Sequence, residues 1–198
     1  VAPAEMIPPS SSPTIALSPD GQTLAFVGHK DNRSQLYLRF LSSLEVKPLA
    51  GTEGASGPFF SPDSEWIGFF STRKLRKVRL RGGSPITICE AQVDRGATWG
   101  PGDMIVFNSS GGFGAGLLRV PASGGTPEPL TQPDAAKDET SHRWPQFLPG
   151  GKKVLFTIWT GTTGRLAALD LRNGAITRFD QTGASPHWVE QGFIVLGN

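Results

Sequence analysis

A short phrase repeats along this chain: an apolar stretch, a tight polar turn and a second apolar stretch. One large apolar residue stands directly before each turn, at Leu17, Phe60, Trp99, Phe147 and Trp188. The phrase returns roughly every 43 residues, a period typical of β-propeller blades, each built from four short strands. The repeat therefore predicts an all-β chain, a β-propeller of four-stranded antiparallel blades. The copies indicate an incomplete propeller with four blades and half of a fifth.

The first turn of two copies carries the residues that a tight turn requires. Proline presets the backbone angle φ, aspartate can bond the backbone ahead of it, and glycine accepts a positive φ. These residues stand at Pro19, Asp20 and Gly21, and again at Pro62 and Asp63. We expect them to be structural turn residues and not catalytic groups.

Apolar runs of strand length follow the turns. In the first repeat we expect strands near residues 15–18, 24–28, 35–41 and 46–49. The pairs Gly82-Gly83, Gly124-Gly125 and Asn173-Gly174 favour two-residue hairpin turns after the third strands of later repeats. The sequence thus predicts a proline-rich linker over residues 1–12 and one propeller domain over 13–198. Its blades are expected at about 13–50, 57–90, 96–131, 142–180 and 184–198.

Charge argues against two classes of partner. The net charge is only +2, and the electrostatic field of so small a charge does not indicate a nucleic-acid partner. In addition, no apolar run is long enough to insert directly into a membrane. One local exception is a stripe of six cations: Arg73, Lys74, Arg76, Lys77, Arg79 and Arg81. It is either a docking stripe for an anionic partner or an exposed strand whose charges protect a sheet edge. The second interpretation is favoured.

Residues that could support catalysis are scattered. The three histidines, His29, His142 and His187, are at least 45 residues apart, and the single cysteine, Cys89, has no histidine nearby. No HExxH motif, calcium-loop spacing or Gly-x-Ser-x-Gly motif occurs. We therefore predict that the chain is not an enzyme, has no catalytic residue, metal or cofactor, and uses Cys89 as a small buried hydrophobe.

One group of residues at the start of the fourth and fifth repeats is a candidate ligand site. His142 and Arg143 lead into Trp144, and His187 stands before Trp188. First strands line the central channel of a propeller, and convergent polar groups at a channel mouth are a typical ligand site. His142, Arg143, Trp144 and His187 are therefore predicted ligand-binding residues. The alternative is that His142 and Arg143 satisfy buried backbone carbonyls beneath a long loop.

The repeat resembles a known group of bacterial propellers. Ser-Pro-Asp-Gly at 18–21, Gln-Leu-Tyr at 35–37, Gly-Gly-Thr-Pro at 124–127 and Leu-Thr at 130–131 are similar to TolB-like, WD-repeat-like propeller repeats. More narrowly, residues 51–55, 67–70 and 141–151 resemble propellers that follow the kinase domain of bacterial receptor-like serine/threonine kinases. Kinase motifs themselves are absent from this chain. The resemblance implies a binding or sensing propeller in a periplasmic or other extracytoplasmic place, with a cytoplasmic place left open.

Two functions remain open from the sequence. The first is a noncatalytic binding, sensing or scaffold propeller that recognises a protein or a small ligand. The second is a propeller enzyme, a lyase or hydrolase, with a site near His142 and His187. A repeat count below that of a closed ring also leaves sheet edges uncovered, so we expect either a homodimer through open edges or association of a propeller fragment.

Overall fold

The structure is a computed structural model, and it describes residues 5–6, 14–30, 33–43, 45–110, 114–189 and 193–197. Its strands form four antiparallel sheets and one two-stranded hairpin. The first sheet contains β1 (Glu5–Met6), β2 (Ile15–Leu17), β3 (Thr23–Lys30), β4 (Arg33–Phe40) and β5 (Val46–Pro48). The second contains β6 (Ser56–Phe60), β7 (Trp66–Ser71), β8 (Lys74–Arg79) and β9 (Ile86–Glu90).

The later sheets follow the same plan. The third contains β10 (Ala97–Gly100), β11 (Met104–Phe107), β12 (Leu118–Pro121) and β13 (Glu128–Pro129). The fourth contains β14 (Ser141–Phe147), β15 (Lys153–Trp159), β16 (Gly164–Asp170) and β17 (Ile176–Thr182). The hairpin contains β18 (Ala184–Val189) and β19 (Phe193–Gly197). Helical structure in the described residues is limited to two single 3-10 turns, η1 (Pro101–Asp103) and η2 (Ala135–Lys137).

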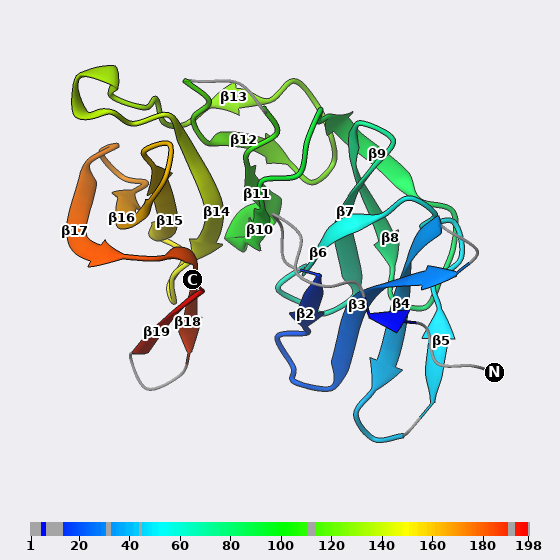
Figure 1. The fold of residues 1–198 in the computed structure, drawn as a ribbon. Helices are drawn as coiled ribbons and strands as arrows, with labels where there is room; N and C mark the ends of the chain where they lie inside the picture. Colours follow the sequence, from blue (N-terminus) through cyan, green and yellow to red (C-terminus); the bar gives the residue numbers. More distant parts are fainter. Residues whose placement is uncertain are drawn as a thin grey trace.

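The sheets are blades arranged along an arc (Figure 1). The first strand of each blade contacts the first strand of the next, in the order β2, β6, β10, β14 and β18. The prediction of four complete blades and half of a fifth is confirmed, and the chain is an incomplete β-propeller.

The Ser-Pro-Asp turns are stabilised by a buried serine, whose hydroxyl forms hydrogen bonds with the aspartate of the turn and with the backbone after it. In the first blade the Thr23 amide donates to Ser18 Oγ at 2.9 Å, and Ser18 Oγ donates to Asp20 Oδ1 at 2.5 Å. The hydrogen bond from Ser18 lowers the pKa of Asp20 below its usual value. Ser61 and Asp63 repeat these contacts in the second blade. The carboxylates of both aspartates therefore have a structural role, as hydrogen-bond acceptors within the turns.

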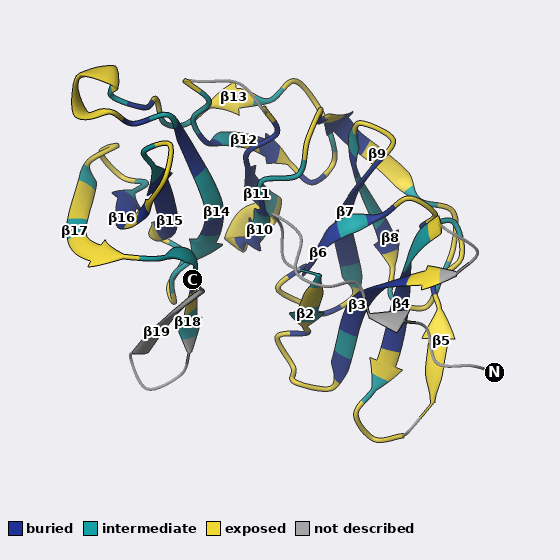
Figure 2. Cartoon of the chain, viewed as in Figure 1, coloured by how far each residue is buried: buried dark blue, intermediate teal, exposed yellow. Residues whose placement is uncertain are grey.

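Apolar side chains fill the spaces between successive blades, and the outer strands β5 and β17 are largely exposed (Figure 2). Phe69 on β7, Phe107 on β11 and Phe156 on β15 are fully buried at matching places in three blades. Burying a side chain of this size contributes about 1.5–3 kcal/mol relative to exposure. The core is therefore distributed over the blade interfaces, as expected for a repeat protein. Cys89 is also buried, and burial raises the pKa of its thiol to about 11.

One interpretation made from the sequence needs correction. The basic stripe does not protect a sheet edge, because β8 lies inside its sheet and pairs with both β7 and β9. Lys77 Nζ and the Arg79 guanidinium each lie 4.6 Å from the centre of the Trp66 ring. Both cations therefore form cation–π contacts with Trp66.

The large apolar residues before the turns differ in burial. Phe60 and Trp99 are core residues with 7% exposure, but Leu17 is 56% exposed because no described strand packs over its face of the first blade. In the segment predicted as a linker, Glu5 and Met6 pair with β3, and residues 1–4 and 7–12 lie outside the described residues.

Candidate functional site

The first strands of all five blades line one open cavity of about 560 Å³. Its wall consists mainly of apolar and aromatic side chains, with a few neutral polar groups. The lining residues are Ile15, Ala16, Leu17, Pro19, Gly57, Pro58, Phe59, Phe60, Gly96, Ala97, Thr98, Trp99, Trp144, Pro145, Gln146, Phe147, Ser185, Pro186, His187 and Trp188. None of these described residues is Asp, Glu, Lys or Arg. A cavity with this lining is the usual form of a site for an uncharged molecule or side chain.

A kink at the start of the first strands shapes the wall of the cavity. Gly57, Gly96, Trp144 and Ser185 occupy matching places in four blades and all have a positive φ. The pairing register shifts at this place in β6, β14 and β18. In these three strands a proline follows the kinked residue, and a proline has no amide hydrogen for the ladder. The sequence thus interrupts each ladder and turns the strand toward the channel.

Neighbouring first strands touch closely at the kinks. The Trp144 amide donates to the Arg95 carbonyl at 2.8 Å, a bond from the fourth blade to the third. A Cβ atom on Gly96 would lie 2.7 Å from Trp144 Cα, so only glycine fits there. Further along, Gln146 Oε1 accepts a hydrogen bond from the Trp188 amide. These contacts join the first strands of the third, fourth and fifth blades beside the cavity.

The structure separates the four predicted ligand residues. Trp144 and His187 line the cavity, and burial lowers the pKa of His187 below its usual value, so this imidazole is neutral at pH 7. Arg143 lies outside the lining: its Nε donates to Ser141 Oγ at 2.7 Å and its guanidinium carbon is 4.8 Å from the centre of the Trp159 ring. His142 is fully buried elsewhere, so the four residues do not form one cluster.

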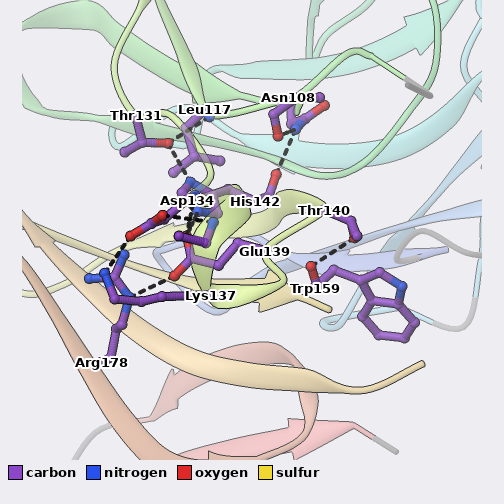
Figure 3. Close-up of polar contacts among 12 residues, drawn as sticks. Asn108, Leu117, Thr131, Asp134, Lys137, Glu139, Thr140, His142, Trp159 and Arg178 are labelled. Atoms are coloured by element: carbon purple, nitrogen blue, oxygen red, sulfur yellow. Dashed lines mark hydrogen bonds and ion pairs between the residues drawn. The ribbon is translucent and has the colours of Figure 1, made fainter. Parts of the chain in front are cut away.

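His142 lies in a buried network of polar side chains between the third and fourth blades (Figure 3). Its Nδ1 is 2.7 Å from Thr131 Oγ1, and its Nε2 is 3.2 Å from Glu139 Oε2. Thr131 Oγ1 also accepts from the Leu117 amide at 2.8 Å, and Glu139 Oε1 accepts from Arg178 Nε at 2.7 Å. The imidazole therefore links a strand end of the third blade to the outer strand of the fourth.

The partners of His142 decide its protonation state. A carboxylate only accepts, so Nε2 carries the hydrogen toward Glu139, and the Thr131 hydroxyl donates to Nδ1. Burial lowers the pKa of His142 below its usual value, although Glu139 opposes this shift. Burial raises the pKa of Glu139, but hydrogen bonds from Arg178, the Asp134 amide and His142 outweigh it and leave that pKa low. The network is thus a neutral histidine beside a charged pair, with both ring nitrogens satisfied.

The sequence missed several residues that hold this network. Asn108 is fully buried, and its Nδ2 donates to the carbonyls of Ala115, Gly116 and His142 at 3.0, 3.0 and 2.6 Å. Glu139 stands three residues before His142, in the loop that leads into β14, and that spacing is the one local signal for it. Arg178 is remote in sequence, and only the fold brings it to Glu139.

A larger hollow of about 970 Å³ lies between residues 133–140 and the outer strands of the fourth blade. Its charged residues have both signs, and three of them are engaged in ion pairs: Lys137 with Asp134, and Arg178 with Glu139. This surface therefore offers no uniform charge to a ligand. Across the described residues there is no group of three or more histidines, cysteines and acids that could hold a metal ion.

Fold and cavity together define this chain as a propeller, and comparisons with known proteins agree. TolB from Acinetobacter baumannii matches with a TM-score of 0.75 and 22% identity, over 90% of this chain and 46% of that one. The propeller domain of Cps50 (Swd1) from Myceliophteria thermophila matches with a TM-score of 0.67 and 14% identity, over 95% and 63%. Oligogalacturonate lyase from Vibrio parahaemolyticus matches with a TM-score of 0.63 and 17% identity, over 84% and 54%.

Sequence comparison adds one curated relative. An uncharacterized protein of Agrobacterium fabrum is 31% identical over 102 residues, which cover 46% of this chain and 34% of that protein. No family model matches the chain. The structural neighbours are thus TolB-like and WD-repeat-like propellers, and the chain spans about a third of the curated relative and less than half of the TolB chain. None of the described helices is long and apolar enough to cross a membrane.

Proposed function

We propose that this chain is part of a noncatalytic recognition propeller, which binds a protein or a small ligand at its central cavity. The observation that carries this proposal is the lining of the cavity, which comes from the first strands of all five blades and has no charged residue. General acid–base and nucleophilic catalysis need ionisable or activated groups at one place. Neutral apolar walls suit binding instead.

The proposal includes a biological context. The resemblance to the propellers of receptor-like kinases supports a sensing role, and the likeness to TolB supports a periplasmic or other extracytoplasmic place. A homodimer through the open face of the first blade is part of the same proposal, because Ile15 and Leu17 on that face are exposed.

The enzyme alternative receives less support from the geometry. A site near His142 and His187 requires both imidazoles to reach one substrate. His142 is fully buried with both nitrogens bonded, while His187 lines the cavity. These two residues therefore do not form an acid–base pair.

A thermal-denaturation screen with product analysis tests the proposal. Neutral sugars, polyuronides and short peptides are added to the chain, and each sample is analysed for cleavage products afterwards. We expect a compound that raises the Tm and is recovered intact, since a ligand at one hundred times its Kd stabilises the fold by about 2.7 kcal/mol.

Two matched variants locate the binding. Thr98→Phe fills the cavity and should abolish the shift in Tm, while Thr162→Phe, on an exposed hairpin, should leave it unchanged. Cleavage of any compound, or a shift that survives Thr98→Phe, would contradict the proposal.

A further inference from the structure

Two arginines occupy the same place in neighbouring blades. The residue directly before the kink of a first strand is an arginine in the third and fourth blades and a small residue in the second and fifth. These residues are Arg95 and Arg143, and Ser56 and Ala184. The Trp144 amide donates to the Arg95 carbonyl at 2.8 Å, so the backbones that carry both arginines lie side by side. The repeat therefore brings two cations together between the third and fourth blades.

The half-buried Arg143 guanidinium is held in one orientation. Its Nε donates to Ser141 Oγ at 2.7 Å, and its carbon lies 4.8 Å from the centre of the Trp159 ring. The Trp159 ring is held in turn by a hydrogen bond from its Nε1 to the Gly161 carbonyl, at 3.2 Å. The two terminal nitrogens of Arg143 have no hydrogen-bond partner among the described residues. They are thus donors that point in a fixed direction, which reduces the entropy lost when a ligand binds.

The two positive charges are not balanced by a carboxylate. Within the described part of the chain, neither Arg95 nor Arg143 forms an ion pair. Burial lowers the pKa of Arg143, and the positive charge of Arg95 lowers it further. Two partly dehydrated cations therefore repel each other here, and an anion beside them would offset that repulsion.

Asp94 is the acid next to Arg95 in the sequence, but its carboxylate is directed toward the second blade. A Cβ on Gly57 of that blade would lie 2.3 Å from Asp94 Oδ2. Asp94 Oδ1 accepts from the Gly96 amide at 3.0 Å, which fixes the carboxylate within its own loop. The charge of Asp94 is therefore placed on the side of the third blade that faces away from the fourth blade and Arg143.

We propose that Arg95 and Arg143 form a site for a doubly charged oxyanion, a phosphate group, between the third and fourth blades. A guanidinium presents its N–H donors in a planar fork that matches two oxygens of one phosphate. A dianion also supplies the two negative charges that the arginine pair lacks. Neither arginine lines the central cavity, so this site goes beyond the proposed function and does not depend on what the cavity binds.

An NMR titration of the whole chain with inorganic phosphate at pH 7.5 tests this site. Sodium chloride keeps the ionic strength constant, so that a change in screening is not mistaken for binding. The Nε–H resonances of Arg95 and Arg143 should shift and should saturate below about 10 mM phosphate. Acetate, which carries one charge, should bind at least fivefold more weakly.

Three variants assign the binding. Arg95→Gln removes one cation, and Arg143→Lys keeps the charge but loses the planar fork, so each should weaken phosphate binding at least fivefold. The Arg95 side chain has no hydrogen bond or ion pair among the described residues, so Arg95→Gln should keep the fold, and circular dichroism checks this. Arg119→Gln is the matched control, because Arg119 is paired with Glu128 on the surface of the third blade, and it should leave the Kd unchanged.

Several results would overturn the proposal. These are the absence of a saturable shift, equal phosphate affinity of wild type and either variant at Arg95 or Arg143, and acetate binding as tight as phosphate binding. A loss of affinity in Arg119→Gln as large as in Arg95→Gln would also overturn it, because it would show general attraction of phosphate to a basic chain. The screen of sugars, polyuronides and peptides tests the proposed function separately.

Discussion

At the scale of single residues, the buried His142 shows how a polar group is accommodated in a blade interface. Its ring is fully buried, packs 4.9 Å from the Phe156 ring, and bonds to Thr131 and Glu139. A buried imidazole with two hydrogen-bond partners stabilises the fold only while it stays neutral, because burying the charged imidazolium would cost its hydration free energy. The same residue that the sequence offers as a ligand candidate thus has a complete structural role.

His142 makes stability dependent on pH. Its folded pKa is lowered below 6.5, so the unfolded chain binds a proton first as the pH falls. The contribution is fully present above about pH 6.5 and is lost progressively below it. We expect the free energy of unfolding, measured with urea, to decrease from pH 7.5 to 5.

Substituting His142 tests whether this residue causes the pH dependence of stability. His142→Gln should cost about 1.5–3 kcal/mol at pH 7.5, because it breaks a buried network, and should flatten the decrease toward pH 5. His187→Gln should keep most of the decrease. A wild-type stability that rises between pH 7.5 and 5 would contradict the argument.

At the scale of elements, glycines set the distance between adjacent blades. A Cβ on Gly100, at the end of β10, would lie 2.4 Å from the Phe147 ring on β14. Within the third blade, a Cβ on Gly116 would lie 1.8 Å from the Thr131 carbonyl oxygen, so close approach also occurs inside a blade. Strand and loop backbones thus approach each other so closely that alanine does not fit without movement. Blade packing is therefore a local and testable property of these positions.

Gly100→Ala should destabilise the chain by about 1–3 kcal/mol through overpacking. Gly102→Ala provides a contrast, because Gly102 has a φ of 68° and open space around its Cβ, so backbone strain alone should cost about 1 kcal/mol. Chemical denaturation of both variants measures the difference. Combining Gly100→Ala with Phe147→Ala should cost less than the sum of the single changes, since the clash is relieved. Additive costs would show that the two residues do not collide.

At the scale of the whole molecule, the arc leaves an apolar face on the first blade. Ile15 and Leu17 on β2 are 46% and 56% exposed, whereas Phe60 and Trp99, which occupy the place of Leu17 in the next two blades, are 7% exposed. The second and third blades cover their matching faces with a neighbour. An exposed apolar face of a sheet is a common site of association.

The isolated chain should therefore associate as its concentration rises, and sedimentation velocity measures this. Leu17→Lys should shift the distribution toward monomer, because it places a charge on the apolar face. Leu41→Lys is the matched control, since Leu41 is 53% exposed but lies in the turn after β4 and not on β2. A monodisperse wild-type monomer at high concentration would argue against association through this face.

Much of the architecture was predictable because it depends on local chemistry. The first strand expected near 15–18 corresponds to β2, and the starts of the later blades expected at about 57, 96, 142 and 184 correspond to β6, β10, β14 and β18. Turns such as Ser18 to Gly21 close through hydrogen bonds between residues a few positions apart, so a short stretch of sequence contains the information. The spacing of the turns then determines the order and number of blades.

Contacts between distant segments had to come from the tertiary structure. The sequence by itself determined an all-β chain of four blades and a half. It could not show that β8 lies inside its sheet, that Arg178 reaches Glu139, or that His142 is buried while Trp144 and His187 face one cavity. These outcomes depend on which face each strand presents after a kink such as that at Trp144, and a shift of one residue reverses every face that follows. Only the packing of complete blades against one another decides that register.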